Sequence, residues 1–392
     1  MFNPHSRPNL EPATSGFISL DHIPSILNID AQSQRLTYSS VSGRGILAGF
    51  MRKEDLMLPY KLLLAVLSIN ILLTCLAPTE SEAGGAIPVN LFNIGNSIGE
   101  GEAADGIIGV RQHDVVWSTG YNLNDIVVSL NERFEAADPA GYYENNAARD
   151  ADFNQAVSGS EMDDFVDQAN EVIAAANQTP AGRAGMLAIL LGNNDVCASS
   201  LDAMTPAEEF ESQYRAGLDV LARSTSTKNA HIHVSGIPAI YWLWEAKRNN
   251  DWCRLGAWPF VPCQNLLDDP INDCGSNNSH LDPDTIHADD GPECIRRKQF
   301  HAKIRDIYNP ILRDVLKEYK DNGRLPNAYY VDVFDIQFGE VHVNDGDCFH
   351  PSTAGHALLA DEQWCRSPWG RYDPLCGRIK PTPWLPLLLL DN

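Results

Sequence analysis

Short apolar runs alternate with longer amphipathic segments along most of this chain, and this alternation constrains the fold more than any other feature of the sequence. A short apolar run is typical of a strand that is buried on both faces, and an amphipathic segment between two such runs is typical of a connecting helix. The strands predicted in this way are Ile87–Ile94, Met186–Leu191, His231–Ile240 and Ala328–Phe334, and the predicted helices are Asp163–Ala175, Pro206–Ala222 and Arg297–Tyr319. We therefore expect an α/β fold in which helices cover both faces of a mainly parallel sheet.

The first 83 residues differ in composition from the rest of the chain. An apolar run at 62–77 follows several basic residues and precedes Ser81-Glu82-Ala83, which is the order of a secretory signal peptide. The run is short for a stable membrane span, although a retained anchor is the alternative. We interpret residues 51–83 as a signal peptide and residues 1–50 as an upstream extension that is either untranslated or disordered. Residues 84–392 would then form the secreted domain.

The charge of the chain argues against two classes of partner. The 392 residues carry a formal net charge of −23, and an acidic surface repels both nucleic acid and anionic membranes. We therefore expect neither nucleic acid nor an anionic membrane surface as a partner.

The cysteines predict disulfide bonds. Removing Cys75 with the signal peptide leaves eight of the nine cysteines, and an even number in an exported domain favours up to four disulfides. Four of the eight lie between Cys253 and Cys294, in a stretch rich in Asp, Asn, Pro and Gly. We interpret residues 241–297 as a cysteine-rich insertion. A zinc site is the alternative, but the spacing of paired CxxC motifs is missing.

Three polar strings supply the groups that acyl transfer to water requires. Gly95-Asn96-Ser97 follows the first predicted strand and Gly192–Asp195 follows the second. Parallel strands end at one edge of a sheet, where binding sites form. Ser97 is the predicted nucleophile, provided that a base removes its proton. The alternative for Ser97 is a helix N-cap.

His350 is the predicted base. Asp347 precedes it by three residues, so the carboxylate can reach Nδ1 and hold the ring with Nε2 towards the serine. His342 is the second choice, whereas His231 and His233 alternate along a predicted strand and fit packing better.

Asn194 is a candidate donor to the negatively charged oxygen that forms when an ester carbonyl is attacked. Its side-chain amide could stabilise this oxyanion, as could the backbone N–H groups of Ser97 and Gly159. Asparagine after a strand is otherwise a common turn residue.

These residues, in this order, resemble the SGNH (GDSL-type) hydrolase superfamily of esterases and lipases. The resemblance spans about 88–366, and the strings that carry it are Phe92–Ser97, Asn154–Gly159, Leu191–Asp195 and Asp347–Ser352. The last string, with Gly355, is most similar to the phospholipase B-like and lipase-like branch. Asn96 departs from the superfamily pattern, which usually has Asp before the serine.

The resemblance implies a flavodoxin-like three-layer α/β/α sandwich that needs no metal and no organic cofactor. It implies Ser97 as nucleophile, His350 as base and Asp347 as the supporting acid. The oxyanion hole would consist of the Ser97 and Gly159 N–H groups and the Asn194 amide.

Three alternatives accompany this interpretation. The string Gly99–Ala104 matches the dinucleotide fingerprint GxGxxA, but Asp105–Gly109 disfavours the helix that should follow. A non-catalytic glycan-binding or adhesion protein is possible on the same fold. The insertion also contains aromatic residues that could either contact an acyl chain or sugar or pack into a core: Tyr241, Trp242, Trp244, Trp252, Trp258 and Phe260.

The sequence thus predicts a secreted serine hydrolase that cleaves a small-molecule or lipid ester through an acyl-enzyme. A carbohydrate O-acetyl esterase on the same fold is the alternative activity.

Overall fold

A computed structural model describes residues 87–142, 153–268, 271–276, 278–370, 373–374 and 376. These residues belong to the compact unit Pro78–Asn392. The predicted upstream extension and signal peptide lie outside the described residues. Within the described residues, none of the helices has the length and apolar character needed to cross a bilayer.

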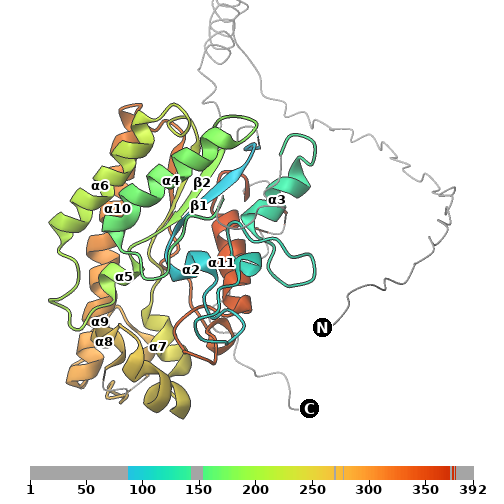
Figure 1. Ribbon diagram of the computed structural model, residues 1–392. Helices are drawn as coiled ribbons and strands as arrows, with labels where there is room; N and C mark the ends of the chain where they lie inside the picture. The colour runs from blue at the N-terminus through green and yellow to red at the C-terminus, as the bar shows by residue number, and fades with distance from the viewer. Residues whose placement is uncertain are drawn as a thin grey trace, which may run out of the picture. The chain divides into compact units, whose positions relative to one another are not determined.

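A parallel four-stranded sheet forms the centre of the described structure (Figure 1). Its order is β1 (Leu91–Gly95), β2 (Met186–Leu190), β3 (His231–Ser235) and β4 (Ala328–Val331). All three pairs of neighbours run parallel. The predicted α/β class with a parallel sheet is therefore confirmed.

A further extended segment lies beside β1. The N–H of Asn93 donates to the carbonyl of Phe153, the carbonyl of Asn93 accepts from Gln155, and both bonds are 2.9 Å long. Val157 continues this pairing by donating to the carbonyl of Gly95. After β1 the chain thus adds a segment on one side and then crosses back to β2 on the other, as in flavodoxin-like folds. Ligand sites form where the strand order reverses in this way.

Helices cover both faces of the sheet. The helices on one face are α4 (Phe165–Gln178), α6 (Ala207–Arg223) and α10 (Asn309–Asp321), and those on the other are α3 (Leu130–Ala137) and α11 (Thr353–Cys365) (Figure 1). In β2, Leu187 and Ile189 belong to the first core, and Met186, Ala188 and Leu190 belong to the second. This alternation is expected of a strand buried on both faces, and it confirms the three-layer sandwich.

The remaining elements are short, apart from α9. They are α2 (Ser97–Glu100), α5 (Asn193–Val196), α7 (Tyr241–Lys247), α8 (Gln264–Leu267), α9 (Pro292–Lys303), and the single turns His113–Val115, Met162–Asp164, Cys253–Ala257, Trp258–Phe260, Ser279–Leu281, Ile304–Tyr308 and Glu340–His342.

The bounds of the predicted elements shift by a few residues in the structure: the first strand begins at Leu91 rather than Ile87, and the fourth ends at Val331 rather than Phe334. Two larger differences have a clear physical reason. The helix predicted over Arg297–Tyr319 is divided into α9 and α10 by a π-helical turn, because Pro310 has no N–H and cannot follow a regular helix without a clash. The predicted strand His231–Ile240 ends at Ser235. Beyond it, the side chain of Asn309 bonds the N–H and carbonyl of Ile237, at 2.7 and 2.9 Å, and replaces a neighbouring strand.

The disulfide prediction is confirmed. The eight cysteines pair as Cys197–Cys263, Cys253–Cys348, Cys274–Cys294 and Cys365–Cys376. All eight sulfur atoms are thereby bonded, so none is a thiolate that could ligate zinc.

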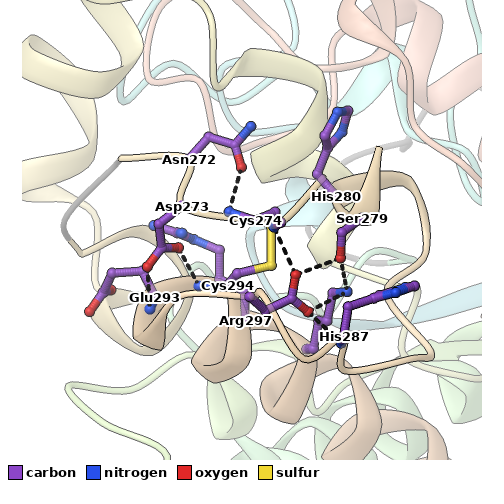
Figure 2. The surroundings of a disulfide bond; sticks show 12 residues. Asn272, Asp273, Cys274, Ser279, His280, His287, Glu293, Cys294 and Arg297 are labelled. Atoms are coloured by element: carbon purple, nitrogen blue, oxygen red, sulfur yellow. Dashed lines mark hydrogen bonds and ion pairs between the residues drawn. A yellow bond between two sulfur atoms is a disulfide. The ribbon is translucent and has the colours of Figure 1, made fainter. Parts of the chain in front are cut away.

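The Cys274–Cys294 disulfide fastens the end of the insertion to the start of α9 (Figure 2). Asp273 accepts hydrogen bonds from the N–H groups of Glu293 and Cys294 and so caps this helix. Nearby, the buried pair Lys298–Asp290 is 2.9 Å apart. The carboxylate of Asp290 lies close to both sulfurs, but the disulfide prevents them from binding a metal.

Gly217 allows α6 to lie close to α4. A Cβ at this position would lie 2.2 Å from the Phe165 ring, so we expect Gly217→Ala to lower the free energy of unfolding by about 1–3 kcal/mol. Denaturant unfolding measures this difference. Ser212→Ala, at an exposed position of the same helix, should change stability by less than about 0.5 kcal/mol. Equal stability of the two variants would contradict this packing.

Candidate active site

Ser97 is the first residue of α2, directly after the buried strand β1. The side chain of Asn96 caps this helix by accepting from the N–H of Ile98 at 3.1 Å. Asparagine caps a helix as well as aspartate does, so the residue that departs from the expected pattern keeps a local function. Gly99 is needed in this turn, because a Cβ there would lie 2.6 Å from that of Ala156.

The ring of His350 joins Ser97 to Asp347. Its Nε2 lies 2.7 Å from Ser97 Oγ, and its Nδ1 lies 2.7 Å from Asp347 Oδ2. The structure therefore brings together three predicted residues from the two ends of the domain. A hydroxyl in this arrangement can pass its proton to the imidazole while the carboxylate stabilises the resulting positive charge.

Asp347 is held by hydrogen bonds on both oxygens. Its Oδ1 accepts from the backbone N–H groups of Phe349 and His350, at 2.9 and 3.0 Å, and from Asn344 Nδ2 at 2.7 Å. Burial alone would raise the pKa of Asp347. The hydrogen bonds and the charge of His350, together with the hydrogen bond from the Phe349 N–H, hold this pKa below its usual value. Asp347 is thus stabilised in its charged form.

The sequence reasoning missed Asn344, which is buried and braces the same loop. Its amide also donates to the carbonyl of His350, and its Oδ1 accepts from the N–H groups of Gly346 and Asp347. An asparagine shortly before Asp347 is a signal of such a turn.

Besides Ser97, the predicted oxyanion donors are Asn194 and Gly159, which lie in two neighbouring segments. Asn194 is in α5, directly after β2, and one N–H of its amide donates to the carbonyl of Ser160 at 2.9 Å. The amide has a second N–H, so it can also serve an oxyanion. Gly159 has φ +86°, a conformation that favours glycine. Ser97, Asn194 and His350 line one pocket, whereas Gly159 is not among its lining residues.

Two further residues hold these loops together and were missed by the sequence reasoning. Gln168 accepts from the N–H of Gly95 and donates to its carbonyl and to Ser160 Oγ, each at 2.9 Å. Glu100 accepts from the N–H of Ser158 at 2.8 Å, next to Gly159. Gln168 could have been recognised in the sequence, because it is a polar residue on the predicted buried face of an amphipathic helix.

His342, the second-choice base, has a local role. Its Nδ1 accepts from the N–H of Gly339 at 2.9 Å, and burial lowers its pKa. Ser97 is bonded by His350 instead.

The pocket beside Ser97 is mainly apolar. Its space is about 580 Å³, including the part open to solvent. The apolar residues that line it are Ile98, Pro238, Ile240, Leu243, Phe338, Val343, Phe349, Pro351 and Leu359.

The aromatic residues of the insertion do not line this pocket. Tyr241, Trp242, Trp244 and Trp258 are buried in the core, and only Trp252 and Phe260 of the set are exposed. The packing interpretation therefore holds for the four buried residues.

The dinucleotide alternative is wrong. The helix that should open at the glycines ends at Glu100, and Gly101 follows it with φ +67°. The chain then turns back, so that the N–H of Gln112 lies 3.2 Å from the carbonyl of Gly101.

Comparison with known proteins supports one family. The family model described as GDSL-like lipase/acylhydrolase matches residues 91–362, which include each candidate residue above. A comparison with curated proteins found no match.

Asp195 supplies a test of the electrostatics beside the pocket. Burial raises its pKa to about 7, and the charge of Glu161 adds to the rise. Between about pH 4 and pH 7 the folded protein therefore keeps a proton that the unfolded chain has lost, so Asp195 costs stability as the pH rises. We expect Asp195→Asn to gain stability relative to wild type over this range, by up to about 1.4 kcal/mol per pH unit.

Urea unfolding at several pH values measures this difference. The amide oxygen of the variant can still accept from Met162, as Asp195 does at 2.9 Å. Ser200→Ala, an exposed change without a titrating group, should differ from wild type by a constant amount. A constant difference for Asp195→Asn as well would contradict the raised pKa.

Proposed function

Because the chain belongs to the GDSL-like lipase/acylhydrolase family, we propose that Ser97, His350 and Asp347 form the catalytic triad of a serine ester hydrolase. The observation that carries this proposal is the continuous hydrogen-bond chain through the His350 ring, with 2.7 Å on each side. Two of its members, Ser97 and His350, line the mainly apolar pocket. A purely glycan-binding protein would not need this chain.

The proposed reaction has two steps. Ser97 Oγ attacks the ester carbonyl while its proton passes to His350 Nε2, and this proton then leaves with the alcohol. Water then attacks the acyl-enzyme and gives a proton to the same nitrogen; His350 returns this proton to Ser97 Oγ as the acid leaves, which restores the free serine. Asp347 stabilises the imidazolium in both steps. The Ser97 N–H, the Gly159 N–H and the Asn194 amide are the proposed oxyanion donors.

The apolar lining of the pocket favours a substrate with an apolar acyl chain. Side chains such as Ile240 and Leu243 would remove the chain from water, whereas a sugar hydroxyl would lose its hydrogen bonds there. A carbohydrate O-acetyl esterase is therefore the less favoured activity. The similarity of Phe349–Ser352 to the phospholipase B-like branch stays a prediction.

We also propose that the protein is secreted. The predicted signal peptide at 51–83 and the four disulfides both support export to an oxidising environment.

The roles of Ser97 and His350 are tested by hydrolysis of a p-nitrophenyl ester. Ser97→Ala and His350→Ala should each lower kcat by about 10⁶-fold, because removing either member disables the whole triad. The folded state should persist in both variants.

His342→Ala is the matched control for the base. His342 lies in the same region but bonds Gly339, so this variant should keep most of the activity. Retention of more than a few per cent activity by Ser97→Ala would contradict the proposed nucleophile. If His342→Ala lost activity while His350→Ala stayed active, the base would be His342 and not His350.

The acyl-chain preference is tested with p-nitrophenyl esters from acetate to octanoate. We expect kcat/KM to rise with chain length by up to about fourfold for each methylene, the ratio that corresponds to about 0.8 kcal/mol. Leu243→Trp should fill the pocket and abolish this rise, while leaving the acetate less affected.

Leu123→Trp is the control, because Leu123 is exposed and does not line the pocket. It should keep the wild-type profile. Preference of the wild type for acetate and for an acetylated sugar would instead favour the carbohydrate esterase.

A further inference from the structure

The loop that carries Asp347 and His350 is attached to the insertion at several points. The disulfide Cys253–Cys348 makes the first attachment, and both cysteines are fully buried. Cys348 lies between Asp347 and His350 in the chain. A covalent bond to the insertion therefore starts within the short segment that sets the geometry of this pair.

Two indole N–H groups of the insertion bond carbonyls of the same loop. Trp258 Nε1 donates to the carbonyl of Cys348, and Trp252 Nε1 donates to that of Gly346, each at 2.9 Å. The Trp258 side chain is buried, so its hydrogen bond is protected from water. The two hydrogen bonds thus fix the backbone on either side of Asp347.

An ion pair adds a further attachment. Lys247 Nζ of α7 lies 2.5 Å from Asp345 Oδ1. The Lys247 side chain is 2% exposed, whereas that of Asp345 is 82% exposed. The exposed carboxylate of Asp345 thus contacts the insertion through Lys247, which forms no other ion pair among the described residues.

The backbone of Cys348 shows why the attachment matters. Its φ is +57°, in the left-handed region that is unfavourable for every residue with a Cβ. This turn allows the N–H groups of Phe349 and His350 to reach Asp347 Oδ1. An unfavourable backbone conformation persists where several surrounding contacts hold it in place. Here the disulfide to Cys253 and the hydrogen bond from Trp258 both hold Cys348.

We infer that the insertion positions the Asp347–His350 pair, with Cys253 and Trp258 as positioning residues for the triad. The inference rests on the proposed function of these two residues. The insertion is then a part of the active-site scaffold. When the contacts between the insertion and the loop of Asp347 and His350 are lost, the imidazole is free to move away from Ser97. A displacement of about 1 Å in such a group costs on the order of 10²-fold in rate.

The main test removes the covalent attachment in the full chain. In Cys253→Ala/Cys348→Ala, kcat should fall by about 10- to 100-fold with little change in KM. The low-field proton NMR signal of the His350 Nδ1–H, which reports its hydrogen bond to Asp347, should broaden or vanish. A purely structural disulfide would lower the unfolding temperature and leave both readouts unchanged.

The matched control is Cys274→Ala/Cys294→Ala. This pair lies at the end of the same insertion and joins it to α9 (Figure 2), without bonding the catalytic loop. We expect kcat and the low-field signal of this variant to stay close to wild type. Equal effects in the two double variants would overturn the inference, because they would reflect a general loosening of the insertion.

A milder variant covers the case in which the double variant does not fold. Trp258→Phe keeps an aromatic ring and removes only the N–H that bonds Cys348, so kcat should fall by roughly 5- to 10-fold, as expected for one lost hydrogen bond. Its control is Trp244→Phe, because Trp244 is buried in the same insertion and its N–H has no hydrogen-bond partner among the described residues. A wild-type kcat and a wild-type signal in Trp258→Phe would overturn the role of Trp258.

The NMR signal separates this inference from the proposed function. If Ser97→Ala stays active, the proposed function fails, but a signal that is lost in Cys253→Ala/Cys348→Ala still shows that the insertion positions the Asp347–His350 pair. If Ser97→Ala is inactive and Cys253→Ala/Cys348→Ala keeps both its kcat and its signal, the positioning role fails alone.

Discussion

The hydrogen bond between Ser97 and His350 joins the end of the first strand to a loop near the end of the domain, and the rest of the site depends on it. These residues are 253 positions apart. The sheet fixes one end of this bond, because Ser97 opens a capped helix at the edge of β1. The other end is fixed by a loop without regular structure. The two sides are therefore held by different means: strand pairing on one side, and side-chain hydrogen bonds with the Cys253–Cys348 disulfide on the other.

Buried polar side chains carry much of this order. Gln168 connects the end of β1 to the loop of Ser160, and Asn344 connects both ends of the Asp347–His350 turn. Each bonds backbone groups at the end of a strand or within a turn, and a buried backbone group without a partner would cost free energy.

The sequence predicts the sheet and the helices because these features depend on local pattern, and it predicts the candidate triad because the order of its polar strings resembles that of a known superfamily. Alternation of apolar runs indicates the layers, and a carboxylate three residues before His350 indicates their contact. The break before Pro310, the pairing of the cysteines and the contacts of Trp258 depend on distant residues that meet only after folding. Asn309 is an example, since nothing near it in the sequence indicates that it ends a strand 72 positions earlier.

The pairing of the cysteines has a consequence for biosynthesis. Cys197–Cys263 and Cys253–Cys348 are interlaced, since Cys253 precedes Cys263 in the chain. During synthesis from the N-terminus, Cys253 is therefore available to Cys197 before Cys263 has been made. The native partner of Cys253 is made only 95 residues later. If Cys197 pairs first with Cys253, the native pairing is reached only by thiol–disulfide exchange, so the interlaced disulfides make the order of oxidation a determinant of correct folding.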